Sequence, residues 1–133
     1  MMIDTSFCID LLREQKRGEI GPATRKLINL GTTRLQMSLF VYCELQHGVR
    51  SSQTSGSEQR RIEMFSESVS VAIPDRSFAT CYGTSAAKLQ KEGLPIPQMD
   101  LLIGVHAASL GFPLLTRDHE HFKRIDGLVV ESY

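Results

Sequence analysis

The sequence predicts an α/β domain in which a central, mainly parallel β-sheet is flanked by α-helices. Short apolar runs of strand length alternate with longer segments of helical period. The 133 residues are enough for one domain with a buried core. With 41 % hydrophobic and 23 % charged residues, the composition is that of an ordinary globular protein. We therefore expect a single domain over residues 1–133.

The charge balance and the cysteines limit the classes of function. Lys plus Arg and Asp plus Glu number 15 each, so no net charge draws the chain toward nucleic acid. The start, "MMIDTSFCID", carries an acid where a secretory leader is basic, and no apolar run is long enough to span a membrane. Cys8, Cys43 and Cys81 lack metal-type spacing, and we expect reduced thiols in the cytoplasm.

The first half of the chain alternates short strands with helices. In order, we predict a strand at 1–4, helices at 7–14 and 23–31, a strand at 34–38 and a helix at 39–49. Thr5 or Ser6 is expected to cap the first helix, and Gly31 to end the second. The small, polar segment Ser51–Glu58 is expected to be a surface turn within the domain.

The second half continues the alternation. In order, we predict a helix at 58–69, a strand at 69–73, a long amphipathic helix up to Gly93, a helix at 98–110, a strand at 112–116, a short helix within 118–125 and a strand at 127–132. Asp75 is expected to cap the long helix.

One carboxylate lies in a segment that should be buried. Between Met99 and Phe112 the only polar side chains are Asp100, His106 and Ser109, and a helix that is apolar nearly all round is a buried helix. A buried carboxylate has to be paired, protonated or bound to a metal. Alternatively, Asp100 is a first-turn acid that the helix dipole stabilises. His106 is expected to be a hydrogen-bonded core residue.

Three further acids raise the same question. Glu44 is the only acid in the apolar helix 39–49, where the alternative is a side chain that reaches the solvent from the helix edge. Asp4 and Asp118 each follow a predicted strand, at the sheet edge where α/β domains bind ligands, although either could simply cap a helix. If all four converge, a divalent cation with oxygen ligands, Mg²⁺ or Mn²⁺, relieves their repulsion. Such a site suits hydrolysis of a phosphodiester.

At these acids the chain resembles the PIN-domain ribonucleases of the VapC toxin type. The resemblance rests on "MIDTSFCIDLL", on "SLFVYCELQHGV" and on the stretch from "GLPIPQMDLLIGVHAASLG" to "FPLLTRDHEHFKRIDGLVVE". It implies a PIN domain, a Rossmann-like three-layer fold. It also implies that Asp4, Glu44, Asp100 and Asp118 form the catalytic metal site, supported by Thr5, Ser6 and Thr116.

The resemblance also implies the activity and the partners. The family's members are Mg²⁺- or Mn²⁺-dependent endoribonucleases, and they usually dimerise. A cognate VapB-like antitoxin silences them and fills the active-site groove. We therefore expect an RNA substrate, an antitoxin, a homodimer and no membrane association. Arg13 and Arg117 are candidates for binding RNA phosphates.

Several residues and two other functions stay open. His119 and His121 form a His-x-His pair without a third ligand at zinc spacing, so a solvated pair is expected. Gly104 lies one turn after Asp100 and could leave room for a metal or for backbone. A receiver-like Mg²⁺-binding signalling module is one alternative function, but no Lys follows a late strand. A catalytically silent PIN fold that binds proteins is the other.

Overall fold

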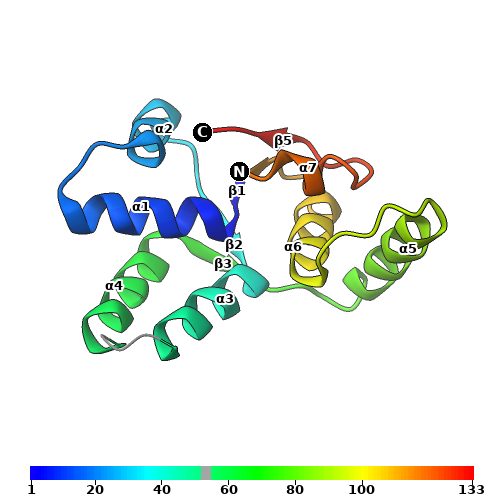
Figure 1. The fold of residues 1–133 in the computed structure, drawn as a ribbon, viewed down its shortest axis with the longest axis horizontal. Helices are drawn as coiled ribbons and strands as arrows, with labels where there is room; N and C mark the ends of the chain where they lie inside the picture. The colour runs from blue at the N-terminus through cyan, green and yellow to red at the C-terminus, as the bar shows by residue number, and fades with distance from the viewer. Residues whose placement is uncertain (52–54) are drawn as a thin grey trace.

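The computed structural model describes residues 1–51 and 55–133 (Figure 1). At its centre is a five-stranded sheet of order β3-β2-β1-β4-β5 in which every pair of neighbours is parallel. The strands are β1 (Met2–Ile3), β2 (Gln36–Ser38), β3 (Ser70–Ala72), β4 (Leu114–Leu115) and β5 (Val130–Glu131). This confirms the predicted α/β class and the parallel sheet.

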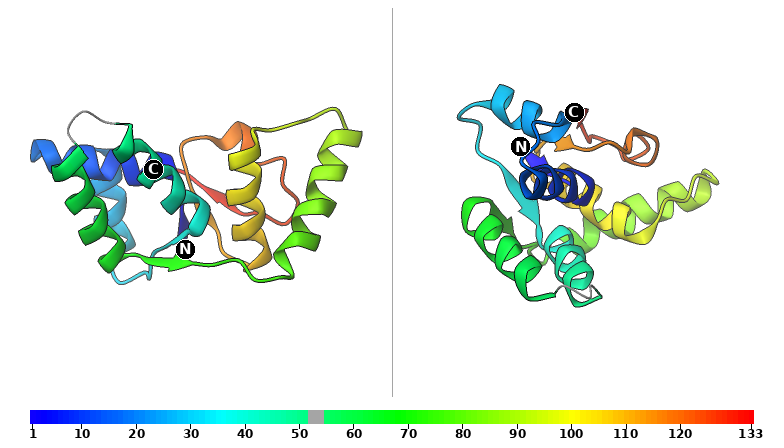
Figure 2. Two further views of the ribbon diagram at one scale, coloured as in Figure 1. Left: turned by 90° about the horizontal axis from the view of Figure 1, so that it is seen from below. Right: turned by 60° about the vertical axis from the view of Figure 1, so that its left-hand side comes forward.

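Helices surround the sheet. They are α1 (Thr5–Arg17), α2 (Pro22–Leu30), α3 (Leu39–Arg50), α4 (Ser55–Ser68), α5 (Phe78–Lys91), α6 (Gln98–Ser109) and the short α7 (His119–Phe122). α1 packs against α2 and α3, whereas α6 contacts α3, α5 and α7. Figure 2 shows from two further directions that α4 lies toward one end of the molecule and α5 at the other. No helix in the described part of the chain has the length and apolar character needed to cross a bilayer.

The order of the strands places a switch point beside β1. From β1 the chain proceeds to β2 and β3 on one side, and it later fills β4 and β5 on the other. Ile3 is in register with Leu115, so the residues that follow them, Asp4 and Thr116, emerge at the same edge of the sheet. In open α/β sheets this crevice at the carboxyl ends of the strands is where ligands bind.

The core consists of the sheet and the inner faces of α1, α3 and α6. Fully buried side chains include Met2, Ile3, Met37, Leu114 and Leu115. In α6, the run from Ile103 to Ala107 is buried, as the apolar sequence predicts. His106 is a core residue, since its Nδ1 lies 2.7 Å from the Ser38 hydroxyl.

Three predicted boundaries were wrong. α1 begins at Thr5 because the Asp4 side chain, not Thr5 or Ser6, accepts the capping bond from the Phe7 N–H. α4 begins at Ser55, so the predicted turn Ser51–Glu58 is helical from there on, and residues 52–54 lie outside the described part. α5 begins only at Phe78, because the Asp75 carboxylate accepts hydrogen bonds from Ser77 in the preceding turn.

Gly104 lets the segment that contains α7 pack closely on α6. A Cβ at this position would lie 2.3 Å from the Ile125 side chain and 2.9 Å from the Phe122 ring. Both of these side chains are almost fully buried and have little room to move. The missing side chain therefore makes room for α7 and the turn after it, and not for a metal.

We expect Gly104→Ala to destabilise the fold by about 1–3 kcal/mol, because it overpacks the contact between α6 and α7. The measurement is chemical denaturation monitored by circular dichroism. Gly83→Ala is the control, since Gly83 is a helical residue with open space around it and should gain roughly 0.5–1 kcal/mol from the better helix former. Equal stability of both variants would contradict the packing argument.

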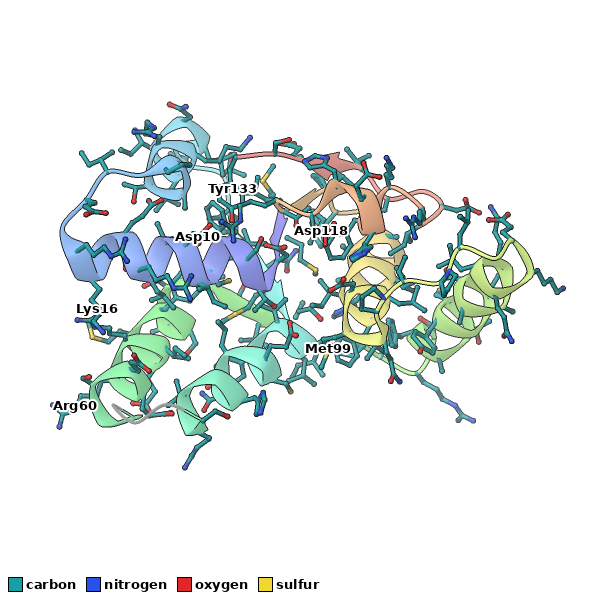
Figure 3. The ribbon with its side chains drawn as sticks, in the orientation of Figure 1. Asp10, Lys16, Arg60, Met99, Asp118 and Tyr133 are labelled. Atoms are coloured by element: carbon teal, nitrogen blue, oxygen red, sulfur yellow. The ribbon has the colours of Figure 1, made fainter. Side chains whose placement is uncertain are left out.

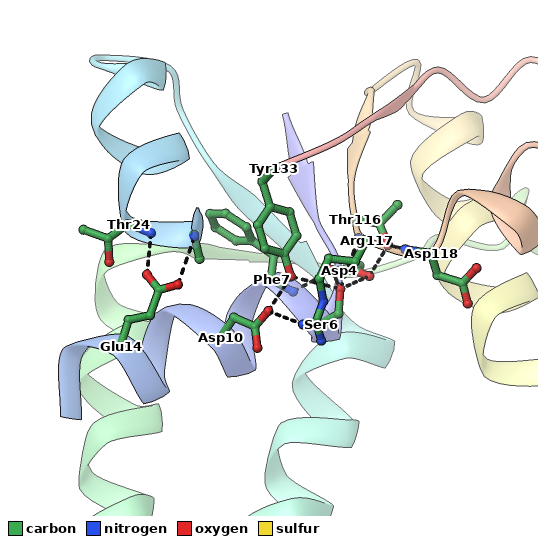
Figure 4. A network of polar contacts seen from close by, with 11 residues as sticks. Asp4, Ser6, Phe7, Asp10, Glu14, Thr24, Thr116, Arg117, Asp118 and Tyr133 are labelled. Atoms are coloured by element: carbon green, nitrogen blue, oxygen red, sulfur yellow. Dashed lines mark hydrogen bonds and ion pairs between the residues drawn. The ribbon is translucent and has the colours of Figure 1, made fainter. Parts of the chain in front are cut away.

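Glu14 is a buried acid with a structural role. The Glu14 carboxylate accepts hydrogen bonds from the backbone N–H groups of Ala23 (3.1 Å) and Thr24 (2.7 Å), so α1 caps the first turn of α2 (Figure 4). Burial raises the pKa of Glu14, but the contacts with Thr24 and Ala23 outweigh it and hold the pKa below the ordinary 4.5.

We expect Glu14→Gln to cost about 0.5–2 kcal/mol at neutral pH, the usual worth of a helix cap. Because the native pKa is lowered, the contribution of the carboxylate is fully present above pH 4.5 and is lost as the pH falls through the native pKa. Denaturant titrations from pH 7 to pH 3 should therefore show the gap between wild type and variant closing. The exposed Glu19→Gln should show a gap that is small throughout.

Candidate active site

All four predicted acids line one cavity at the switch point of the sheet. The cavity has a volume of about 320 Å³, and Asp4, Glu44, Asp100 and Asp118 all contribute to its wall. The other predicted residues on its wall are Thr5, Ser6, Arg13 and Arg117. The acids come from the end of β1, from α3, from α6 and from the loop before α7. Side chains separated by as many as 114 positions thus converge at one place.

Asp4 is the most buried of the four acids, with 5 % of its surface exposed. Its Oδ1 accepts the capping bond from the Phe7 N–H at 2.8 Å, and the Ser6 hydroxyl lies 2.8 Å from both of its oxygens. Burial raises the pKa of this carboxyl, while Thr116, Phe7 and Ser6 lower it less and Asp100 adds to the rise. Asp4 therefore holds its negative charge at a cost that a bound cation would remove.

Thr116 joins Asp4 to Asp118. Its fully buried hydroxyl donates a hydrogen bond to Asp4 Oδ2 and accepts one from the Asp118 N–H at 2.9 Å (Figure 4). The Asp118 carboxylate then caps α7 by accepting the His121 N–H at 3.3 Å. One hydroxyl thus fixes the loop after β4 relative to the end of β1.

Glu44 approaches the cavity from α3. Its carboxylate accepts a hydrogen bond from the Thr5 hydroxyl in the first turn of α1. The side chain is only partly buried and also lines a second, larger groove of about 670 Å³. Glu44 therefore lies where the site opens toward α1, α3 and α4.

Asp100 lies in the first turn of α6, beside Asp118 and His121. The His121 Nδ1 is 2.9 Å from Asp100 Oδ2 and 2.9 Å from Asp118 Oδ2. Burial raises the pKa of the Asp100 carboxyl, which its contact with His121 partly offsets. One ligand atom from each of these three residues lies within 4.8 Å of the others. The expectation of a solvated His119–His121 pair was therefore wrong for His121.

A second polar network orients Arg117. Its guanidinium is 2.9 Å from Asp10 Oδ2, and the Tyr133 hydroxyl donates to the same oxygen at 2.9 Å (Figure 4). The Tyr133 ring packs edge-on against Phe7, with 4.9 Å between the ring centroids. Burial raises the pKa of Tyr133, so its hydroxyl remains a neutral donor. Sequence reasoning missed Asp10 and Tyr133, because only the fold brings them together.

The donor set fits a divalent metal ion. Four carboxylates face a small cavity, two of them have raised pKa values, and carboxylate oxygens are the ligands that Mg²⁺ and Mn²⁺ take in proteins. Cations supplied by the chain itself balance only part of this charge, since Arg117 is paired with Asp10. Among the described residues, ligand atoms of Asp100, Asp118 and His121 lie close enough together to share one ion.

The chain is similar in sequence to known ribonucleases. The chain is 35 % identical over 127 residues to ribonuclease VapC1 of Haemophilus influenzae, covering 96 % of this chain and 92 % of that protein. It is 30 % identical over 133 residues to the tRNA(fMet)-specific endonuclease VapC of Shigella flexneri, covering 99 % and 96 %.

The fold and the family agree as well. A solved structure of VapBC-1 from nontypeable Haemophilus influenzae superposes with a TM-score of 0.85 at 33 % identity, over 98 % of this chain and 96 % of that one. The family described as PIN domain matches residues 1–128. The resemblance inferred from the acidic motifs is thereby confirmed, and the chain belongs to the PIN domain family.

Proposed function

We propose that this protein is an endoribonuclease toxin of the VapC type that hydrolyses RNA phosphodiester bonds with the help of Mg²⁺ or Mn²⁺. The observation that carries the proposal is the convergence of four acids from four separate segments on one cavity at the switch point of the sheet. Relatives at 35 % and 30 % identity are named ribonuclease and tRNA-specific endonuclease, which supports an RNA substrate and makes tRNA the first one to test.

The residues of the cavity divide into holding and positioning roles. Asp4, Asp100, Asp118 and Glu44 would hold the metal, which when bound lowers the pKa of a coordinated water and offsets charge on phosphate oxygens. Thr116 and Ser6 keep the Asp4 carboxylate in place through their hydroxyl groups. Thr5 does the same for Glu44.

The two alternatives account for less of the structure. A receiver-like module needs a Lys after a late strand, whereas here Thr116 follows β4 and bonds to Asp4. A silent PIN fold would have no need of four carboxylates that line one cavity, two of which, Asp4 and Asp100, have pKa values raised by burial. Metal binding and RNA cleavage distinguish the silent fold from the nuclease.

The groove beside the cavity suits the expected antitoxin. It is lined by apolar side chains of α1, α3 and α4, such as Leu12, Leu45 and Ile62, with Lys16 and Arg61 among the charged ones. It shares Ile9, Arg13 and Glu44 with the catalytic cavity. An antitoxin segment with an apolar face and acidic side chains would fit here and reach the acids. The homodimer that the resemblance implies stays a prediction, and light scattering can test it.

We expect Asp100→Asn to lower RNA cleavage at least ~100-fold, because it removes a charged metal ligand. Folding should be unaffected, since the new side chain has the same shape and its burial carries no charge penalty. The assay is cleavage of total RNA or purified tRNA with Mg²⁺ or Mn²⁺, with and without EDTA. Asp126→Asn, at an exposed residue away from the cavity, is the control. Full cleavage in EDTA, or by the Asp100→Asn protein, would refute the proposal.

We expect Arg117→Ala to raise KM for RNA with little effect on kcat, because a guanidinium beside the acids contacts a phosphate before and during the reaction. The slope of log binding constant against log salt concentration should become shallower by about 1. We expect the same changes in KM and in the salt slope for Arg13→Ala. Arg60→Ala, on the outer end of α4 (Figure 3), is the control and should leave the slope unchanged.

A further inference from the structure

His121 contacts two of the four acids of the cavity, Asp100 and Asp118. Its Nδ1 is equidistant, at 2.9 Å, from one oxygen of Asp100 and one of Asp118. Those two acids reach the cavity from α6 and from the loop after β4, and the imidazole is where they meet. The side chain is about one-third exposed, so the ring is open to the solvent from which a metal would arrive.

The two distances from His121 Nδ1 match the separation of neighbouring donors in a metal coordination sphere. Two donors on adjacent corners of an octahedron, each about 2.1 Å from the ion, are about 3.0 Å apart. The two distances from Nδ1 have this value, and all three donor atoms lie within 4.8 Å of one another. An ion could be held by the imidazole and both carboxylates after small side-chain rotations.

The backbone around His121 is fixed by packing. The following residue, Phe122, is 2 % exposed and lies against the position where Gly104 has no side chain. Asp118 caps the same short helix through the His121 N–H at 3.3 Å. The ring is therefore presented to Asp100 by a rigid support. His119, two residues earlier, turns away, and its Nε2 contacts the Ser132 hydroxyl at 2.6 Å.

We propose that His121 is a metal ligand that makes this site prefer Mn²⁺ to Mg²⁺. The inference rests on the proposed function, since it assigns a nitrogen donor to the same metal site. Mg²⁺ is a hard ion that binds oxygen ligands and keeps its water, whereas imidazole nitrogen favours transition metals. Binding through Nδ1 requires that the ring proton be on Nε2.

The alternative is that His121 only holds the two carboxylates together when no metal is bound. In that case its Nδ1–H is a hydrogen-bond donor that the ion displaces, and the coordination sphere contains oxygen alone. The two possibilities differ in whether nitrogen is bonded to the ion, which spectroscopy measures without reference to activity.

The direct test uses the full chain loaded with one equivalent of Mn²⁺. Electron spin echo envelope modulation of the bound Mn²⁺ detects a directly coordinated ¹⁴N. We expect this ¹⁴N modulation in the wild type, its loss in His121→Gln and its persistence in the matched control His119→Gln. A second measurement is the ratio of Mn²⁺ to Mg²⁺ affinity by calorimetric titration. It should fall about 10-fold or more in His121→Gln and stay constant in His119→Gln.

The outcomes separate this inference from the proposed function. Mn²⁺ that binds the wild type and is released by Asp100→Asn, but shows no ¹⁴N modulation, would overturn the role of His121 and leave the metal site standing. Modulation that survives in His121→Gln would also overturn it. Absence of Mn²⁺ and Mg²⁺ binding to the wild type would overturn both proposals. Loss of modulation together with a lower affinity ratio in His121→Gln alone supports the nitrogen ligand.

Discussion

The concentration of negative charge at the carboxyl ends of β1 and β4 is the constraint around which the site is built. Asp4 follows β1, Asp118 follows β4, and the parallel register of these central strands forces them to the same edge. Asp100 then enters from α6. Burial raises the pKa values of Asp4 and Asp100, so the native fold disfavours the charged form of both. A fold that retains such a group of acids requires compensation by hydrogen bonds, by cations or by both.

Capping a helix is compatible with the metal-holding role that we propose for Asp4 and Asp118. Asp4 caps α1 through Oδ1 while its Oδ2 accepts the Thr116 hydroxyl. Asp118 caps α7 through Oδ1 while its Oδ2 faces His121. Helix capping was the alternative to a metal role for both acids, and both do cap a helix. Capping fixes one oxygen and thereby aims the other, so the helix termini serve to preorganise the site.

The α/β fold and the convergence of the four acids on one cavity could be predicted because both depend on patterns within short stretches of sequence. An acid in the apolar run of α6 and acids after β1 and β4 stand out by their surroundings. Asp10, His121 and Tyr133 do not, since an exposed-looking helix acid, a polar helix turn and a terminal tyrosine are ordinary. Their roles depend on distances between segments, such as the 2.9 Å from Tyr133 to Asp10. Element boundaries failed where one side chain decides the cap, as at Asp4 and Asp75.

Two polar networks adjoin the acidic site. In the first, Arg117, which lines the cavity, forms an ion pair with Asp10 that the Tyr133 hydroxyl supports. In the second network, His121 Nδ1 contacts one carboxylate oxygen of Asp100 and one of Asp118. Because both supports rest on packed aromatic residues, Phe7 under Tyr133 and Phe122 after His121, the charge pattern is set by the core. Hydrophobic packing therefore positions the residues that contact the acids.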